Sequence, residues 1–175
     1  MIIPGGLNIW NQIKKSFQKY PARMKVAKKM IDLGIRVDDN QKLYCGNLKI
    51  SITGIAEACE VDRKAVMATI NSILKDEYLT VIFKNIIPAG TLLKNIAPNL
   101  GLGVIEIETQ RKNNGILAEI SKLTSDKNLS IRQAYANDTE MESLPILTII
   151  TETSASDDLI KEILKIEGVM KVSIY

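Results

Sequence analysis

Four side chains between positions 63 and 71 are of types that contact nucleic acid, and their spacing is that of one helix face: Arg63, Lys64, Met67 and Asn71. Arg63 or Lys64 could pair with guanine or with a phosphate. The Asn71 amide could read adenine, and Met67 could touch a thymine methyl group. If these residues lie on the outward side of a helix, that helix could enter the major groove of DNA.

The sequence around this face predicts a pair of crossing helices. Ala56 is small enough to allow close helix crossing, and Asp62 suits the N-cap of the second helix. A shared core would come from Ile55, Cys59, Val61, Val66 and Ile70. With these features, residues 55–70 resemble a helix-turn-helix. Glu60 departs from the pattern, which usually has a turn glycine there. A helical pair used only for packing or dimerisation is the alternative.

Residues 102–175 predict strands and helices in the order βαββαβ. Period-two alternation marks strands at 104–108 and 129–135, while 145–152 and 169–175 complete the set. Apolar residues with helical spacing mark helices that start at Ile116 and near Leu159. A capping-box sequence at 154–157 precedes the second helix, and Gly168 ends it. Two crossovers of this length give a split βαβ, ferredoxin-like sandwich.

The run at 113–120, which follows a strand and precedes residues 128–131, resembles an ACT domain. ACT domains are small ligand-sensing modules attached to enzymes and regulators of amino-acid metabolism. Their usual motif has Pro before the glycine and Asp or Asn three residues before it, whereas this chain has Asn114 and Lys112 at those positions. The resemblance implies a ligand site formed by Lys112, Asn113, Asn114, Gly115, Ile116, Leu117 and Ser130.

Backbone chemistry also favours a ligand at this loop. Residues 110–115 lead into a helix N-terminus, where free N–H groups favour an anion such as an amino-acid carboxylate. Asn113, Asn114 and Ser130 could hold the polar ends of such a ligand. Simple turn chemistry is the alternative for the two asparagines.

Composition favours two modules with different partners. Residues 1–90 have 14 Lys and Arg against 8 Asp and Glu, a net charge of +6, whereas residues 91–175 have 9 against 12, a net charge of −3. Basic halves are often merely solvated, so this charge alone does not establish a nucleic-acid partner. The spacing of Cys45 and Cys59 matches neither a disulfide framework nor a metal-binding motif. The chain has no His, which is the commonest general base in enzymes. We therefore predict no cofactor, no metal site and no enzyme activity.

The remaining patterns complete the predicted organisation. A helix is predicted at 7–20, and a second one starts at Pro21. The outer side of the second helix has Lys25, Lys28 and Lys29, and such a run of charges is usually only the solvent-exposed face of a helix. A short hairpin is predicted at 35–45, with a further strand at 48–51. Residues 78–86 predict a strand that could serve as a wing, and 91–100 a short helix.

The predicted domains are a helix-turn-helix domain at 1–90, a connector at 91–101 and an ACT domain at 102–175. The predicted fold class is thus α+β, with a mostly helical, winged N-terminal domain and a ferredoxin-like C-terminal one. No apolar run approaches membrane-spanning length and the N-terminus has no basic region of a signal peptide, so a cytoplasmic location is expected.

The combination resembles the predicted regulators of amino-acid metabolism in archaeal genomes, which join a helix-turn-helix to a C-terminal ACT domain. This resemblance implies a transcriptional regulator whose partners are DNA and an amino acid or similar effector. A homodimer or a higher homo-oligomer is expected, because pairing of edge strands between two chains would remove an exposed sheet edge. The alternative is a regulatory subunit or dimerisation protein that modulates a biosynthetic enzyme without binding DNA.

Overall fold

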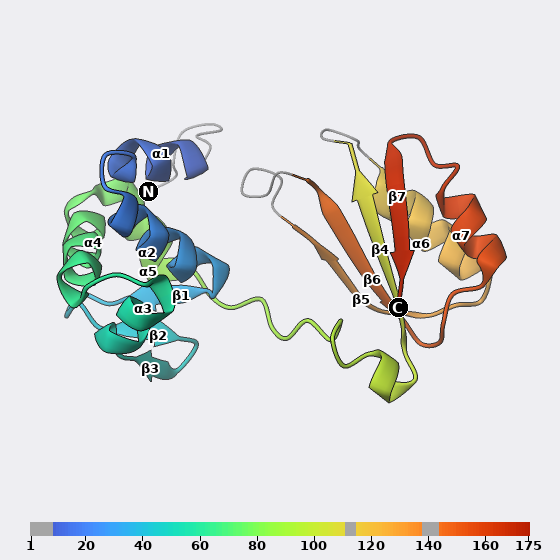
Figure 1. Cartoon of the computed structure of the whole chain (residues 1–175), viewed down its shortest axis with the longest axis horizontal. Coiled ribbons are helices and arrows are strands. Elements are labelled where there is room, and N and C mark those ends of the chain that lie inside the picture. The colour runs from blue at the N-terminus through green and yellow to red at the C-terminus, as the bar shows by residue number, and fades with distance from the viewer. Residues whose placement is uncertain (1–8, 111–114, 138–143) are drawn as a thin grey trace. The chain divides into compact units, whose positions relative to one another are not determined.

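The protein divides into two compact units, Met1–Gly90 and Thr91–Tyr175, seen in the computed structural model (Figure 1). The structure describes residues 9–110, 115–137 and 144–175. Both units combine helices with an antiparallel sheet, which confirms the α+β fold class. Within the described residues, no helix is long and apolar enough to cross a membrane.

The first unit packs its helices around a buried core beside a small sheet. Its helices are α1 (Ile9–Phe17), α2 (Pro21–Asp32), α3 (Ile52–Cys59), α4 (Arg63–Lys75) and α5 (Glu77–Asn85). Strands β1 (Ile35–Val37), β2 (Leu43–Cys45) and β3 (Leu48–Ile50) form an antiparallel meander between α2 and α3. Fully buried side chains from four helices and β1 form the core, among them Phe17, Met30, Ile35, Ile70 and Phe83. The predicted hairpin at 35–45 is confirmed.

The predicted wing strand at 78–86 is wrong, because these residues form helix α5. The Asp76 carboxylate starts this helix by accepting hydrogen bonds from the backbone N–H groups of Tyr78 (2.9 Å) and Leu79 (3.0 Å). Leu79 and Phe83 are both fully buried, and their four-residue spacing belongs to a helix face. The sheet of this unit therefore precedes the helical pair in the chain instead of following it.

The second unit has the predicted βαββαβ order. It consists of β4 (Gly103–Thr109), α6 (Ile116–Asp126), β5 (Ile131–Ala136), β6 (Ile146–Thr151), α7 (Asp157–Ile163) and β7 (Val169–Ile174). The strands form one antiparallel sheet in the order β5-β6-β4-β7, which is the ferredoxin-like arrangement. Helices α6 and α7 cover the same face of this sheet (Figure 1). Between helices and sheet lies a core that includes Ile105, Ile107, Ile120, Ile149 and Leu159.

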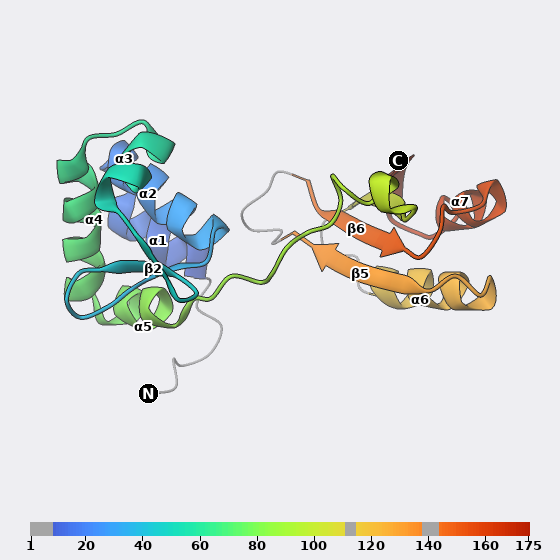
Figure 2. The same cartoon turned by 90° about the horizontal axis from the view of Figure 1, so that it is seen from below.

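The opposite face of the sheet is partly covered by residues 91–102, which we call the strap (Figure 2). Ala97 is fully buried against Val104 and Ile150, and these two residues alternate with the core residues Ile105 and Ile149 along their strands. Because successive strand residues point to opposite faces, the strap lies on the face without helices. The predicted helix at 91–100 is wrong, since the only helix in the strap is the short 3-10 helix η1 (Pro98–Leu100), preceded by a hydrogen-bonded turn at 94–97.

Candidate functional sites

A polar side chain caps the N-terminus of each helix in the predicted helix-turn-helix. The Ser51 hydroxyl accepts a hydrogen bond from Gly54 N at 2.9 Å, and the Asp62 carboxylate accepts one from Ala65 N at 2.6 Å. Each bond satisfies a backbone N–H group at the first turn of its helix. The predicted capping role of Asp62 is confirmed.

Glu60 adopts the left-handed conformation that glycine usually supplies in this turn, with φ 54° and ψ 47°. The backbone N–H groups of Glu60 and Val61 donate to the carbonyls of Glu57 (3.1 Å) and Ala56 (3.0 Å), which closes the C-terminal end of α3. The expected shared core is present in Ile55, Cys59, Val66 and Ile70, which are buried, whereas Val61 is only half-buried. The helices therefore cross as in a helix-turn-helix, without glycine at the turn.

The four residues predicted to contact DNA all lie on α4. Arg63, Lys64 and Asn71 are exposed and Met67 is half-buried, while Val66, Ile70 and Ile73 fill the inner side of the helix. In the part of the chain that the structure describes, neither Arg63 nor Lys64 takes part in an ion pair. The outward side of α4 thus presents two cations without an ion-pair partner among the described residues, followed by an amide. Cations suit the phosphates of a nucleic acid, and an amide suits the hydrogen-bonding edges of its bases.

Only part of the predicted ligand loop can be placed. Lys112, Asn113 and Asn114 lie outside the described residues. Gly115 is the N-cap of α6, with φ 93° and no side-chain cap, and a Cβ atom there would meet no atom of the described residues within 4 Å. Ile116 is buried in the core and Leu117 is 47% exposed. Among the described residues, Gly115 and Leu117 are thus exposed at the N-terminus of α6, while Ile116 has a packing role.

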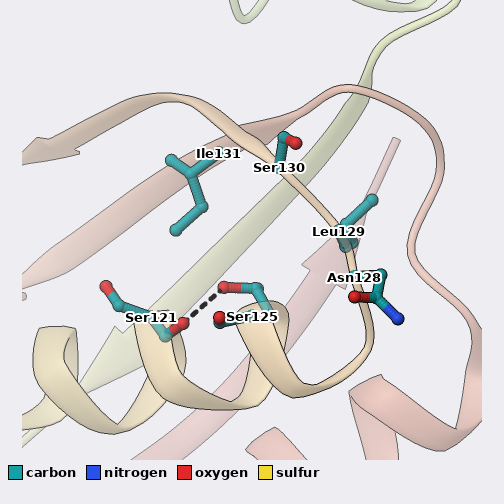
Figure 3. Close-up of a pocket in the computed structure, with 7 residues that line it drawn as sticks. Ser121, Ser125, Asn128, Leu129, Ser130 and Ile131 are labelled. Carbon is teal, nitrogen blue, oxygen red and sulfur yellow. Dashed lines mark hydrogen bonds between the residues drawn. The ribbon is translucent and has the colours of Figure 1, made fainter.

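Ser130 lies at the other end of α6 from Gly115. The helix between them has 11 residues, which corresponds to a length of roughly 16 Å. Ser130 instead lines a cavity of about 420 Å³ between the C-terminal half of α6 and the start of β5 (Figure 3). The other lining residues are Ser121, Thr124, Ser125, Asn128, Leu129 and Ile131. The structure therefore places Ser130 away from Gly115, at the opposite end of α6.

The hydroxyl-rich character of this cavity was missed from the sequence. Ser121 and Ser125 stand four residues apart on α6, a spacing that could have indicated a shared polar face. Asn128 has a left-handed backbone (φ 53°) and turns the chain from α6 into β5. Thr124 is satisfied internally, because its hydroxyl donates to the carbonyl of Ser121 or Ile120 at 3.0 Å. Ser121, Ser125 and Ser130 supply the hydroxyl groups that could meet a small polar molecule.

A separate polar cluster joins the strap to the sheet. The Lys94 ammonium donates to the Glu106 carboxylate at 2.7 Å and lies 5.3 Å from the centroid of the Tyr175 ring. Burial by itself would raise the pKa of Glu106, but the hydrogen bond from Lys94 comes next and lowers it, together with hydrogen bonds from Tyr175 and Thr148 and the charge of Lys94. The net pKa lies below the ordinary value, so this carboxylate is ionised at neutral pH.

The described residues do not supply the parts of a metal centre. Among them, no group of three or more His, Cys, Asp or Glu side chains is arranged to hold a metal ion. Cys45 and Cys59 are free thiols. The described residues offer cations on α4, and hydroxyl and backbone donors at the two ends of α6.

No family model matches the chain, and no curated protein gives a significant match. The C-terminal domain of the MgtC protein from Mycobacterium tuberculosis is similar over 42% of this chain and 84% of its own, at 18% identity and a TM-score of 0.37. The ACT domain of GTP pyrophosphokinase from Chlorobium tepidum is similar over 42% of this chain and 96% of its own, at 22% identity and a TM-score of 0.35.

A third solved structure is similar over more of the chain. It is a transcriptional regulatory protein of the AsnC family from Pyrococcus furiosus, with 13% identity over 89% of this chain and 86% of its own, and a TM-score of 0.27. At such TM-scores, the fold assignment rests on the strand order and helix placement of this chain itself.

Proposed function

We propose that this protein is a transcriptional regulator, in which residues 1–90 bind DNA and residues 102–175 bind an amino acid or a similar small molecule. The observation that carries the proposal is the capped α3–α4 pair, whose second helix presents Arg63, Lys64 and Asn71 to solvent. The net charge of +6 on residues 1–90 supports a polyanionic partner for the same unit. Residues 91–101 would connect the two activities.

The dimensions of α4 suit the major groove. A helix of 13 residues is about 20 Å long, and the groove of about 12 Å admits one helix with its side chains. In such a docking, the N-terminal residues of the second helix meet base edges and phosphates. Arg63 and Lys64 occupy the first turn of α4, and Asn71 follows two turns later on the same side. Phosphate contacts would position the unit, and Asn71 would contribute sequence preference.

The test is the salt dependence of duplex binding by Arg63→Ala combined with Lys64→Ala. Each phosphate that is no longer bound should lessen the slope of log K against log salt by about 0.9, so the slope of the double variant should fall by up to about 1.8. Both side chains are exposed, so the fold should survive. The matched control is Lys122→Ala with Lys165→Ala, which removes the same charge from exposed positions of the second unit. Failure of the full chain to bind any duplex would refute DNA binding and favour the regulatory-subunit alternative.

The N-terminus of α6 is our first choice for the effector site. The helix has 11 residues, and its first N–H groups have no side-chain cap at Gly115, so a carboxylate could accept from them. Leu117 is exposed beside this end and could contact an apolar side chain of the ligand. Asn113 and Asn114 would add polar contacts, as the resemblance to ACT domains implies.

A thermal-shift screen of the twenty amino acids on the full chain tests effector binding. A specific ligand at a hundred times its dissociation constant should add about 2.7 kcal/mol to stability. Gly115→Val should abolish this gain, since a side chain there would crowd a ligand that approaches the backbone N–H groups. The gain is measured against the ligand-free variant, because the φ of 93° strains any side chain at this position. Ser130→Ala is the companion variant, because it changes only the cavity at the other end of α6. A gain that survives Gly115→Val and is abolished by Ser130→Ala would place the effector in that cavity instead.

A further inference from the structure

The first unit has a second basic surface besides the outward side of α4. A groove of about 370 Å³ lies between α2 and the turn that follows α3, and we call it the lysine groove. Its lining residues are Lys25, Lys28, Lys29, Asp32, Ala58, Cys59 and Glu60. The sequence predicted these lysines only as the outer side of a helix. The structure places them together around one concave surface.

The three lysines are neighbours on one side of α2. They stand at positions i, i+3 and i+4 of the helix, where like charges repel by a few tenths of a kcal/mol per pair. Across the described ranges, none of the three takes part in an ion pair. Asp32 and Glu60 also line the groove, so its cations outnumber its carboxylates by three to two. An anion bound there would relieve the repulsion among the lysines.

The floor of the groove does not add negative charge. Cys59 is 6% exposed, and its thiol donates a weak hydrogen bond to the carbonyl of Lys25 at 3.9 Å. Burial raises the pKa of this thiol, against the opposing charges of Lys29 and Lys25, so the sulfur is neutral at pH 7. The charge that a ligand meets in the groove is therefore set by the lysines and two carboxylates at its rim.

The groove lies close to the first turn of α4. Glu60 lines it, and Arg63 follows Glu60 by three residues in the chain. Three Cα–Cα steps of 3.8 Å span at most about 11 Å. A DNA strand whose phosphates meet Arg63 and Lys64 could thus continue past the lysine groove within a few nucleotides.

We propose that the lysine groove binds phosphates of the DNA backbone next to the site read by α4. The proposal rests on the DNA-binding function above and extends its interface from α4 to α2. Contacts of this kind fix the position of a protein on the duplex and raise its affinity for all sequences alike. Lys25, Lys28 and Lys29 therefore act on affinity, as the phosphate contacts of Arg63 and Lys64 do, whereas Asn71 of α4 acts on sequence preference.

The test compares three triple variants of the full chain on a mixed-sequence duplex over a range of salt concentrations. Lys25→Gln with Lys28→Gln and Lys29→Gln should lessen the salt slope by about 0.9 for each phosphate that is no longer bound, up to about 2.7. Lys122→Gln with Lys161→Gln and Lys165→Gln removes the same net charge from the second unit and should leave the slope within about 0.5 of the parent value. The charge-conserving variant Lys25→Arg, Lys28→Arg, Lys29→Arg should retain the parent slope.

The outcomes distinguish failure of the lysine-groove proposal from failure of the proposed DNA-binding function. If the parent binds no duplex, both proposals are refuted. If the parent binds DNA and Arg63→Ala with Lys64→Ala weakens that binding, but the α2 glutamine variant keeps the parent salt slope, only the lysine-groove proposal is refuted.

Amine footprinting of the parent gives a second readout that needs no variant. Bound DNA should slow reductive methylation of Lys25, Lys28 and Lys29 relative to Lys122 and Lys165. Unchanged methylation of the three groove lysines would overturn the inference.

Discussion

Glu60 holds the backbone conformation on which the crossing of α3 and α4 depends. Left-handed backbone costs a residue with a Cβ atom roughly 1–2 kcal/mol. The surrounding structure enforces it through the hydrogen bonds from Glu60 N and Val61 N to α3 and through burial of Ala56 and Cys59 before the turn. The helix-turn-helix pattern was thus recognisable from the sequence although its usual glycine is absent, because caps and core residues carry most of the pattern.

Replacement of Glu60 by glycine should stabilise the protein. Relief of the left-handed strain exceeds the extra backbone entropy that glycine loses on folding, so the free energy of unfolding should rise by about 0.5–1 kcal/mol. Urea unfolding monitored by circular dichroism measures this change. Glu57→Gly is the control, because an exposed helical position of α3 should instead lose about 1 kcal/mol. A loss of stability in Glu60→Gly would show that its side chain has a role that the backbone does not explain.

Glu106 should make stability depend on pH in the acid range. Its folded pKa is lowered from 4.5, so its contribution is present above pH 4.5 and is lost as the pH falls through the lower folded pKa. Glu106→Gln removes this contribution, and the free energy of unfolding at pH 7 should fall by about 1 kcal/mol. The difference between parent and variant should shrink below pH 4.5. A difference that stays constant across the acid range would contradict ionisation as its cause.

At the scale of elements, the sequence predicted what short-range patterns determine. The βαββαβ order of the second unit followed from period-two and helical spacing, and each expected strand and helix of that order is present. Residues 78–86 misled the prediction because β-branched and aromatic residues such as Tyr78, Thr80 and Val81 favour strands. The Asp76 cap and burial of Leu79 and Phe83 outweigh that preference. Local propensity is therefore decisive only where packing does not oppose it.

The strap shows why other features could not be predicted. Leu93 N donates to the Gln133 side-chain oxygen at 3.0 Å, and the Gln133 amide donates to Thr91 O at 2.8 Å. These partners are 40 and 42 residues apart, so no window of sequence shows them together. The same limit applies to the candidate sites. Arg63, Lys64 and Asn71 share one helix and were predictable as a face, whereas the lysine groove joins α2 to a turn about thirty residues later.

Loss of the Gln133 side chain should loosen the strap. Gln133→Ala removes both hydrogen bonds, and amides in residues 91–102 should exchange hydrogen faster by roughly tenfold or more, since each bond contributes about 1 kcal/mol. Hydrogen exchange measured by mass spectrometry on the full chain tests this. Arg132→Ala is the matched control, because Arg132 is the exposed neighbour on β5. Equal exchange of residues 91–102 in both variants would show that burial of Ala97 alone holds the strap.

At the scale of the whole molecule, the distribution of charge and of exposed sheet edges favours different roles for the two units. The positive net charge lies on residues 1–90, with α4 and the lysine groove, and the negative net charge lies on residues 91–175. In the second unit, β5 and β7 are the edge strands, and the residues of β5 are mostly exposed. Unprotected strand edges tend to pair with another chain. We therefore expect the second unit to supply the contact between two copies of the chain.

A dimer through the β5 edge is our last prediction. The fragment should begin at Thr91, because the strap packs on the sheet and Ala97 is fully buried there. Residues 91–175 and the full chain should both sediment as dimers at micromolar concentration, because edge-to-edge pairing would continue the sheet across two copies.

Tyr135 on β5 is 45% exposed, and Tyr135→Lys should shift the full chain to monomer by placing a charge on that edge. Met170→Lys on the β7 edge is the control and should leave the dimer intact. If Met170→Lys dissociates the dimer and Tyr135→Lys does not, the two copies pair through β7. A parent chain that sediments as a monomer would contradict the predicted dimer.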